Sequence, residues 1–486
     1  MDGNGRSRSL HIVMLPWAAL GHLLPFLELS KRLAKRGHRV SYISTPRNIQ
    51  RLLPTVPPHL SHLIELLPFP LPPVDGLPDS AEATIDLPTD DLRPYLRTAY
   101  DTLQQNLHDF LSHNFSTTAT STHQPVDWLV YDYAAYWAPR VAARFRVPCA
   151  YLGLFNAAVL AFNGPPAELL GNGQRRMLPE EFTVVPGWVP FASTIAYRLH
   201  EVRKLFEPSF VPDASGVTEG FRFAASIEEC GFVAVRSCVE FEAEWLDLLG
   251  KLLSKPIVTV GMLPPAARAR VPEGADGEGA FKWLDEQEPS SVVYAAFGSE
   301  VKLTREQVQA IALGLELSQL PYLWALRAGT IPEGIREGAR GRGLVCTGWV
   351  PQSRILAHPS VCGFLTHGGW NSIVEGLSLG RAMVVLPLIF DQGLNARNLV
   401  QRKLAVEVPR DDDDGSFTGE GIADSLRLVM VEAQGEGFRT KARECVDIFG
   451  NEDIQDRCLD DFVHYLWENR KNSEYSEQSN SIDRVV

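Results

Sequence analysis

The chain has 486 residues, of which 45% are hydrophobic and 22% charged, and this globular usage excludes a wholly disordered or collagen-like protein. At roughly 150 residues per domain, the length predicts two or three domains. The formal net charge of −13 excludes nucleic acid and acidic membranes as expected partners, because both require a basic face.

The N-terminal apolar run over residues 10–17 follows Arg6 and Arg8, as the apolar part of a secretory signal would. An amphipathic helical pattern over 23–36 comes directly after it, so we interpret the run as a buried strand. The seven cysteines are scattered and include no Cys-x-x-Cys pair, which predicts reduced thiols rather than disulfides or a zinc site. No apolar run reaches the roughly 18 residues that span a bilayer. We therefore expect a cytoplasmic protein without membrane insertion.

Short apolar runs alternate with helical patterns along the chain, which predicts parallel sheets flanked by helices. In the first half we expect strands at residues 10–17, 39–45, 63–69, 127–133, 148–154, 232–237 and 256–262. A second series follows at 291–297, 322–326, 343–350, 361–366 and 382–389. In this second series, Thr304 and Gln307 have the spacing of a capping box that opens a helix.

The two series are separated by residues 263–279, where Pro, Gly, Ala and charged residues predict a linker. The fold class is thus predicted to be α/β, with two doubly wound Rossmann-like domains that face each other across a cleft. They are expected over residues 1–262 and 280–468, followed by a frayed or disordered tail over 469–486. Such folds bind ligands at the carboxyl ends of their strands.

Polar residues follow the expected strands in both halves, at those carboxyl ends: His22, Asp132, Ser299, His367, Asp391 and Gln392. A single such residue is usually a helix cap, but the repetition in both halves predicts a functional cleft. In the stretch 367–372, two glycines allow close backbone approach, and Asn371 or Ser372 can cap a helix expected over 373–379. The exposed N–H groups at such a helix start predict an anion site without formal charge, although an ordinary N-cap has the same pattern.

Competing anion-site signatures are missing from the sequence. No Gly-x-Gly-x-x-Gly follows a strand and no P-loop motif occurs, which disfavours a nicotinamide cofactor and excludes a P-loop NTPase. The His-Gly-Gly at 367–369 is similar to the oxyanion turn of esterases. No Gly-x-Ser-x-Gly accompanies it, so an esterase-like hydrolase would lack its nucleophile.

A 44-residue stretch at 349–392, WVPQSRILAHPSVCGFLTHGGWNSIVEGLSLGRAMVVLPLIFDQ, resembles the signature of plant UDP-sugar-dependent glycosyltransferases of family 1. The resemblance extends over nearly the whole chain, including Arg-Ser-Cys-x-Glu-Phe-Glu at 236–242 and Val-Val-Tyr-x-x-Phe-Gly-Ser at 292–299. Ser-Thr-Pro-Arg-Asn at 44–48 further resembles the branch-forming subgroup, which adds a sugar to a sugar already on a plant metabolite. The resemblance implies the GT-B fold, with the acceptor in the first domain and the UDP-sugar in the second.

The resemblance also implies a donor site. Trp349 would stack on the uracil, with Val350 and Gln352 beside the uridine, and Glu375 would accept hydrogen bonds from the ribose. The diphosphate is expected at Ser299, His367, Gly369, Asn371 and Ser372. The transferred sugar is expected at Trp370, Asp391 and Gln392. A Gln at the end of the signature resembles the glucose-preferring members.

The implied reaction is an inverting transfer, with His22 as general base and Asp132 orienting its imidazole. We expect glucose from UDP-glucose to reach an apolar glycoside acceptor, with UDP-rhamnose as the alternative donor. The only Asp-x-Asp lies within the acidic run 411–414, so we expect neither a metal nor a cofactor. A monomer is expected, and a non-catalytic UDP-sugar-binding protein is the alternative from another class.

Overall fold

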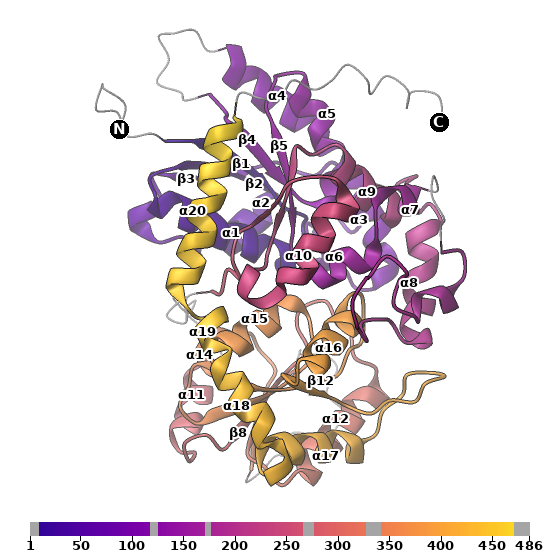
Figure 1. Cartoon of the computed structure of the whole chain (residues 1–486). Helices are drawn as coiled ribbons and strands as arrows, with labels where there is room; N and C mark the ends of the chain where they lie inside the picture. Colours follow the sequence, from indigo (N-terminus) through magenta and orange to yellow (C-terminus); the bar gives the residue numbers. More distant parts are fainter. Residues whose placement is uncertain (1–8, 117–124, 171–175, 266–276, 327–341, 471–486) are drawn as a thin grey trace.

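The computed structural model describes residues 9–116, 125–170, 176–265, 277–326 and 342–470. These residues form two lobes stacked one above the other, each built on a parallel sheet (Figure 1). Most of the expected linker, residues 266–276, and of the expected tail, residues 471–486, lies outside the described residues. None of the described helices is long and apolar enough to cross a membrane.

The N-terminal sheet contains, within the described residues, seven parallel strands in the order β3-β2-β1-β4-β5-β6-β7. They are β1 (His11–Leu15), β2 (Arg39–Ser44), β3 (Ile64–Pro68), β4 (Trp128–Tyr131), β5 (Cys149–Gly153), β6 (Phe232–Val235) and β7 (Ile257–Thr259). Every strand expected in this half is confirmed, with shorter ends. The central strands are buried on both faces, which explains why they read as continuous apolar runs.

The C-terminal sheet has, in the described part, six parallel strands in the order β10-β9-β8-β11-β12-β13. They are β8 (Val292–Ala296), β9 (Tyr322–Ala325), β10 (Gly343–Cys346), β11 (Val361–Thr366), β12 (Ala382–Val385) and β13 (Ala405–Glu407). The first five were expected. Strand β13 was not, because three residues at a sheet edge are too short to produce a recognisable pattern.

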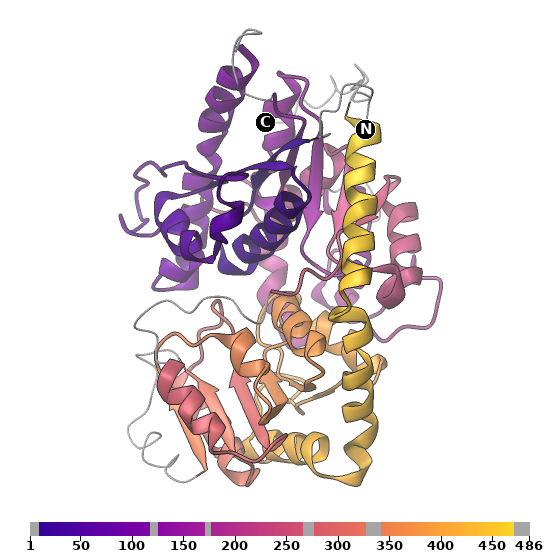
Figure 2. The same cartoon turned by 90° about the vertical axis from the view of Figure 1, so that its left-hand side faces the viewer.

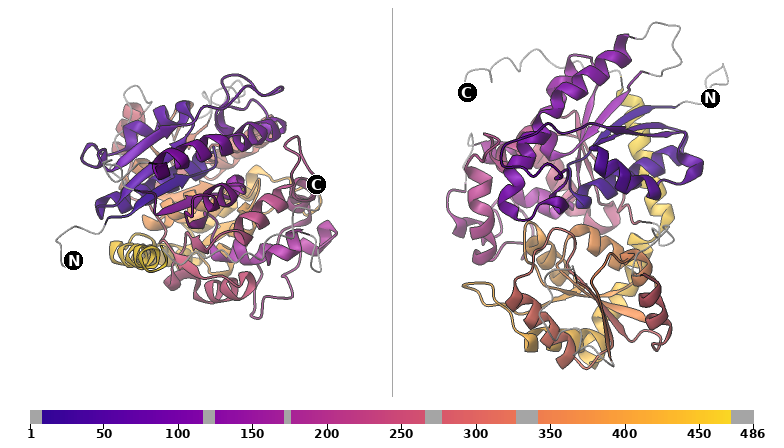
Figure 3. Two further views of the ribbon diagram at one scale, coloured as in Figure 1. Left: turned by 90° about the horizontal axis from the view of Figure 1, so that it is seen from above. Right: turned by 180° about the vertical axis from the view of Figure 1, so that it is seen from behind.

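Helices cover both faces of each sheet (Figures 1 and 3). In the N-terminal lobe they are α1 (Leu20–Lys35), α2 (Pro46–Leu52), α3 (Arg93–Asp101), α4 (Leu103–Ser116), α5 (Ala138–Ala143), α6 (Ala157–Asn163), α7 (Pro166–Leu170), α8 (Leu199–Phe210), α9 (Glu219–Glu228) and α10 (Val239–Leu253). Later in the chain follow α11 (Gly277–Asp285), α12 (Arg305–Leu317), α14 (Gln352–Leu356), α15 (Trp370–Ser378), α16 (Gln392–Gln401), α17 (Gly419–Met430), α18 (Glu436–Glu444), α19 (Val446–Phe449) and α20 (Glu452–Asn469).

The two helices that matter most for the site begin earlier than expected. Helix α1 starts at Leu20, so His22 lies in its first turn rather than in a loop. Helix α15 starts at Trp370 with Gly369 as its N-cap, so Asn371 and Ser372 lie inside its first turn rather than at the cap. Neither N-cap residue has a capping side chain that the sequence could reveal. The capping box of Thr304 at α12 is confirmed.

The last helix, α20, returns to the N-terminal lobe. Leu459, Phe462 and Leu466 pack into the core on one face of the N-terminal sheet, and the Trp128 indole N–H donates to the Leu466 carbonyl at 2.9 Å. Figure 2 shows α20 lying along the upper lobe, and Figure 3 shows it end-on beside that sheet. The second domain expected over 280–468 is therefore divided between the lobes at its C-terminal end.

Both sheets reverse their strand order at one point, between β1 and β4 and between β8 and β11. The connections that leave two such neighbouring strands diverge, and a crevice opens at their carboxyl ends. His22 and Asp132 follow β1 and β4, while Ser299 and His367 follow β8 and β11. The topology thus places these four polar residues at the two switch points.

Candidate active site

His22 and Asp132 form a hydrogen-bonded pair in the N-terminal lobe. The His22 Nδ1 atom lies 2.6 Å from Asp132 Oδ2. Asp132 is buried, and its carboxylate also accepts from the backbone N–H groups of Trp17 at 3.2 Å and Tyr133 at 2.6 Å. Because Asp132 can only accept when ionised, His22 keeps its proton on Nδ1, and Nε2 is the atom left to accept one.

The pKa of His22 is raised above its ordinary value of 6.5. Burial disfavours the charged imidazolium, but this effect is outweighed by the charge and hydrogen bond of Asp132 and by the charges of Glu300 and Asp391. Glu300 and Asp391 belong to the C-terminal lobe, so both lobes act on one imidazole. The His22 imidazole is therefore a stronger base than that of a free histidine.

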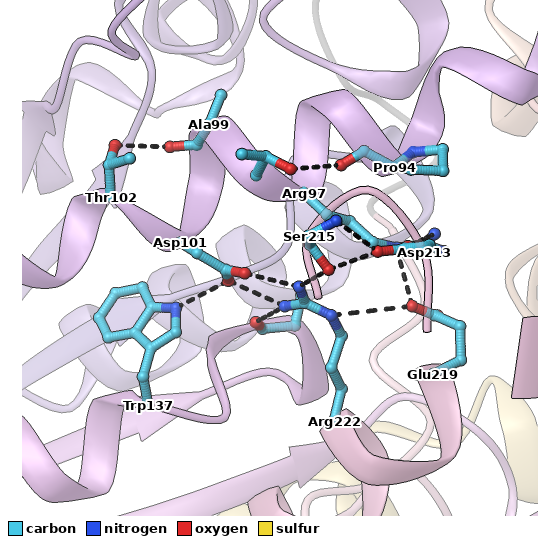
Figure 4. Close-up of polar contacts among 12 residues, drawn as sticks. Pro94, Arg97, Ala99, Asp101, Thr102, Trp137, Asp213, Ser215, Glu219 and Arg222 are labelled. Atoms are coloured by element: carbon cyan, nitrogen blue, oxygen red, sulfur yellow. Dashed lines mark hydrogen bonds and ion pairs between the residues drawn. The ribbon is translucent and has the colours of Figure 1, made fainter. Parts of the chain in front are cut away.

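A buried ion network holds the turn that follows Asp132. The Arg222 side chain is fully buried, lies 2.6 Å from the Asp101 carboxylate and donates to the Ala134 carbonyl at 3.2 Å. The Trp137 indole donates to the same Asp101 at 3.1 Å. Figure 4 shows this cluster, with the Arg97–Asp213 pair beside it. The network fixes the backbone of the turn and so restrains the carboxylate that orients His22.

His367 lies at the end of β11, buried against the backbone of two glycines. A Cβ atom on Gly298 or Gly369 would come within 2.7 and 2.6 Å of His367 Nε2, so neither position accommodates a side chain without movement. Burial lowers the pKa of His367 to about 4. The ring is therefore neutral at neutral pH and acts as a hydrogen-bonding group rather than a cation.

The residues expected around the uridine lie beside α14 and α15. Trp349 is 58% exposed, which is unusual for a tryptophan and leaves its ring accessible for stacking. Gln352 Nε2 donates to Ser372 Oγ at 3.4 Å, and Ser353 Oγ donates to Glu375 Oε2 at 2.8 Å. Burial raises the pKa of Glu375. These hydrogen bonds join the start of α14 to the first two turns of α15.

Two expected donor contacts have buried side chains. Trp370 packs between Phe241 and Phe449, with ring centroids 5.9 and 6.1 Å away, and its indole N–H donates to the Arg236 carbonyl at 3.1 Å. Val350 belongs to the same core. The indole N–H of Trp370 is thus used within the protein, and its contact with a sugar stays a prediction.

Asn371 connects the two lobes through both ends of its amide. Its Nδ2 donates to the Gly21 carbonyl at 2.8 Å, and its Oδ1 accepts from the Arg236 guanidinium. The Gly21 carbonyl lacks its usual helical partner because Pro25, four residues later in α1, has no N–H. The first turn of α15, in the C-terminal lobe, is thereby tied to the residue next to His22.

Arg236 begins the Arg-Ser-Cys-x-Glu-Phe-Glu motif at 236–242, but the sequence indicated no role for it. It follows β6, is 2% exposed, and donates through Nε to the Met262 carbonyl at 2.7 Å. Burial lowers its pKa to about 10, so it stays charged at neutral pH. The anion site expected without formal charge therefore has a cation from the other lobe beside Asn371. A buried arginine directly after a strand is the signal that could have identified it.

Asp391 and Gln392 begin α16 after strand β12. Asp391 Oδ2 accepts from Asn395 Nδ2 at 2.8 Å, and burial raises its pKa to about 6. Gln392 is buried, and its Oε1 accepts from the backbone N–H groups of Leu388 and Ile389 at 2.9 and 3.0 Å. Gln392 thus orders the loop that carries Asp391.

Phe390, directly before Asp391, has a left-handed backbone with φ of 54°. Such a conformation costs a non-glycine residue roughly 1–2 kcal/mol, so it persists only where the surroundings impose it. The ring is 40% exposed, and the Arg93 guanidinium from α3 lies over it at 5.1 Å. Phe390 was not anticipated from the sequence, because no residue pattern indicated a strained turn.

A second set of contacts joins the lobes on the Ser299 side. Glu300 accepts from Thr84 Oγ1 at 2.7 Å and pairs with Arg93 at 2.9 Å. Lys302 donates to the Leu87 carbonyl at 3.1 Å. Ser299 itself is half-buried next to Glu300. The loop after β8 therefore lies against the N-terminal lobe at the edge of the site.

Comparisons with known proteins identify the family of this chain. A family model described as "UDP-glucoronosyl and UDP-glucosyl transferase" matches residues 279–434. UDP-glycosyltransferase 91C1 of Arabidopsis thaliana is 46% identical over 462 residues, covering 95% of this chain and 97% of that protein. Soyasaponin III rhamnosyltransferase of Glycine max is 36% identical over 475 residues, covering 96% and 97%.

The fold is also that of solved structures. The crystal structure of Medicago truncatula UGT71G1 complexed with UDP-glucose has a TM-score of 0.74 at 22% identity, and the match covers 95% of this chain and 98% of that one. At this identity the match establishes the two-lobed architecture alone. Taken with the sequence relatives, it shows that the chain belongs to the plant UDP-glycosyltransferases of family 1, in the group of UDP-glycosyltransferase 91C1, and is an enzyme of GT-B fold.

Proposed function

We propose that this enzyme transfers glucose from UDP-glucose to a hydroxyl of a sugar already attached to an apolar plant metabolite, with inversion at the anomeric carbon. The observation that carries the proposal is the hydrogen-bonded pair of His22 and Asp132 at 2.6 Å, acted on by the charge of Asp391 in the opposite lobe. A base in one lobe and a sugar-binding carboxylate in the other suit a reaction between two substrates held separately.

The donor binds the C-terminal lobe. The exposed Trp349 ring stacks on the uracil, with Val350 and Gln352 beside it, and Glu375 accepts from the ribose hydroxyls. The diphosphate lies at the start of α15, where the backbone N–H groups of a helix N-terminus favour an anion. Neutral His367 and the hydroxyl groups of Ser299 and Ser372 add hydrogen bonds there, beside Gly369 and Asn371.

The sugar lies between the lobes. Asp391 accepts hydrogen bonds from its hydroxyls, Gln392 donates to them through its amide N–H₂, and the backbone next to Trp370 lines the same space. An ionised Asp391 is the stronger acceptor for sugar hydroxyls, and its pKa of about 6 means that it is mostly ionised at neutral pH. We expect the anomeric carbon to face His22, because the charge of Asp391 acts on that imidazole from the opposite lobe.

The chemical step then needs no external reagent. The Nε2 atom of His22 takes the proton of the acceptor hydroxyl, and that oxygen forms a bond to C1 of the sugar. The bond between C1 and the β-phosphate oxygen breaks, and its electron pair leaves on UDP. Asp132 stabilises the imidazolium, while the amides of the α15 start and buried Arg236 stabilise the leaving diphosphate by several kcal/mol.

The alternative donor is UDP-rhamnose, because one relative, 36% identical over nearly its whole length, is named a soyasaponin rhamnosyltransferase. Glucose is preferred here because Asp391 is followed by Gln392 at the end of the donor motif. Turnover with UDP-glucose and UDP-rhamnose should be compared on one panel of glycosides. Faster rhamnose transfer would overturn the donor assignment while leaving the enzyme class intact.

The test of the proposal is mass spectrometry of products formed from a mixed pool of plant glycosides and aglycones with UDP-glucose. A mass increase of one hexose on glycosides, with fragments showing two linked sugars, is expected. Products formed only from aglycones would contradict the acceptor class. Binding of UDP without any product would favour a non-catalytic UDP-sugar-binding protein, and labelling of a serine by a phosphonate probe would favour a hydrolase.

A further inference from the structure

Asn395, in the first turns of α16, connects the phosphate turn, the sugar loop and the acceptor lobe. Its Nδ2 donates to the Gly368 carbonyl at 3.0 Å and to Asp391 Oδ2 at 2.8 Å. Its Oδ1 accepts from Nδ2 of Asn156, in the N-terminal lobe, at 2.8 Å. Asn395 is 1% exposed, so these hydrogen bonds are made without competition from water.

The orientation of the Asn395 amide is dictated by its partners. A carbonyl and a carboxylate can only accept, so the amide NH₂ must face Gly368 and Asp391. Asn156 must present its own NH₂, because its Oδ1 already accepts from the Val159 N–H at 2.9 Å as the N-cap of α6. Every hydrogen bond in this chain is therefore donated in the same sense. Asn156 donates to Asn395, and Asn395 donates to Gly368 and Asp391.

The Gly368 carbonyl belongs to the turn that precedes α15, where Gly368 has φ of 81°. Asn395 thus holds the Gly368 carbonyl, next to the expected phosphate contacts, and the Asp391 carboxylate, which is itself an expected sugar contact. The Asn156 end contacts neither. Movement of one lobe against the other would break the Asn156–Asn395 bond before it disturbed the donor contacts themselves.

We propose that Asn156 and Asn395 are a positioning pair, which sets the register of the acceptor lobe, and hence of His22, against the donor sugar. This inference rests on the proposed function, because it assigns the pair a role in transfer. Neither residue exchanges a proton with a substrate. Their contribution is to hold the acceptor oxygen and the anomeric carbon at the distance where attack is possible, and misplacement by about 1 Å can cost on the order of 100-fold in rate.

The variants that test the pair are Asn395→Ala, Asn156→Ser and the double mutant. Serine at position 156 can still cap α6, but its side chain is shorter than that of asparagine, and we expect its hydroxyl not to reach residue 395. The bond between the lobes is then lost while the N-terminal lobe is preserved. The matched control is Asn398→Ala. Asn398 is also buried in α16 and also bonds the N-terminal lobe, through Glu242 Oε1 at 3.3 Å, but no hydrogen bond joins it to Gly368 or Asp391 among the described residues.

Each variant is measured for kcat and KM of transfer, for UDP affinity by calorimetry, for hydrolysis of UDP-glucose without acceptor, and for thermal stability. Asn395→Ala and Asn156→Ser should lower kcat by about 10- to 100-fold, with hydrolysis less affected than transfer and, in Asn156→Ser, with UDP affinity unchanged. The double mutant should be no slower than Asn395→Ala within about threefold, because the two residues act through one bond. Asn398→Ala should lose stability but keep kcat within about twofold.

Additive effects in the double mutant, or equal kcat losses in Asn395→Ala and Asn398→Ala, would show a merely structural role and overturn the proposal. Loss of UDP affinity in Asn156→Ser would overturn it as well, because that residue does not contact the donor loops. Failure of the proposed function looks different: the wild-type enzyme itself would then transfer no sugar from UDP-glucose or UDP-rhamnose.

Discussion

The side-chain amide of Asn371 donates to the main-chain carbonyl of Gly21 at 2.8 Å, across the boundary between the two lobes. That carbonyl lacks an intrahelical partner because Pro25 provides no N–H four residues later. One proline in the N-terminal lobe thus leaves free the carbonyl to which a residue of the C-terminal lobe donates. Since His22 follows Gly21, the contact joins the residue next to His22 to the first turn of α15.

Replacing Asn371 with Ala should destabilise the protein by about 1–3 kcal/mol, because buried Arg236 and the Gly21 carbonyl lose a partner. Pro25→Ala restores an N–H that can reach the Gly21 carbonyl. Its stabilising effect should therefore be larger in the Asn371→Ala background than in the wild type, where that carbonyl is already bonded. Urea unfolding of the four proteins measures the difference. Equal stabilisation by Pro25→Ala in both backgrounds would show that Asn371 does not stabilise the protein through the Gly21 carbonyl.

The charge and hydrogen bond of Asp132 raise the pKa of His22, while burial opposes them. A base must be unprotonated to act, so transfer should rise with pH through a midpoint above 6.5, the ordinary histidine value. Asp132→Asn should move this midpoint to lower pH and reduce kcat by about 100- to 10,000-fold. The pH dependence of kcat/KM checks both effects, and an unshifted midpoint would contradict the assignment of the base.

Trp349→Ala should weaken UDP binding by about 1–3 kcal/mol, the usual contribution of one aromatic ring stacked on a base. Its exposed side chain contributes little to the core, so thermal stability should be almost unchanged. Trp349→Phe retains a ring and serves as the control, with a smaller loss of affinity in calorimetric titration. If the two variants bind UDP as tightly as the wild type, the uracil lies elsewhere.

Two substitutions separate the backbone strain at Phe390 from the role of its ring. Both Phe390→Gly and Phe390→Ala remove the contact with Arg93, but only Gly relieves the left-handed backbone. The Gly variant should therefore be more stable than the Ala variant by about 1 kcal/mol, although a Gly normally makes a protein less stable than an Ala at the same position. Denaturant midpoints measure this, and an Ala variant at least as stable as Gly would show that position 390 carries no strain.

The sheets were predictable because their strands are buried on both faces and appear as apolar runs between helical patterns. The helix starts were less predictable, because α1 begins at Leu20 and α15 at Trp370 without capping side chains. The helix that became α1 was expected to start at residue 23, which left His22 before it in a loop. Strand ends such as Thr366 identified where polar residues converge, because parallel topology gathers carboxyl ends at one edge.

The contacts between the lobes could not be read from the sequence, since nothing local tells which side chains meet across a cleft. Arg236 and Asn395 were missed for this reason, whereas Phe390 was missed because no residue pattern indicated a strained turn. Asn395 nonetheless lies four residues after Asp391, the spacing at which two residues of a helix meet. Asn156 interrupts an apolar stretch directly after a strand. A buried polar residue in such a place needs a partner, and here the partner is in the other lobe.

The most direct test of a base in one lobe acting on a UDP-sugar held in the other is the His22→Ala variant, assayed for UDP affinity and sugar transfer in parallel. UDP should bind this variant as tightly as the wild type, since the proposed nucleotide site lies in the other lobe, while transfer to every glycoside acceptor falls below detection. Transfer at the wild-type rate in a variant that binds UDP normally would contradict the assignment of His22 as the base and, with it, the two-lobe mechanism.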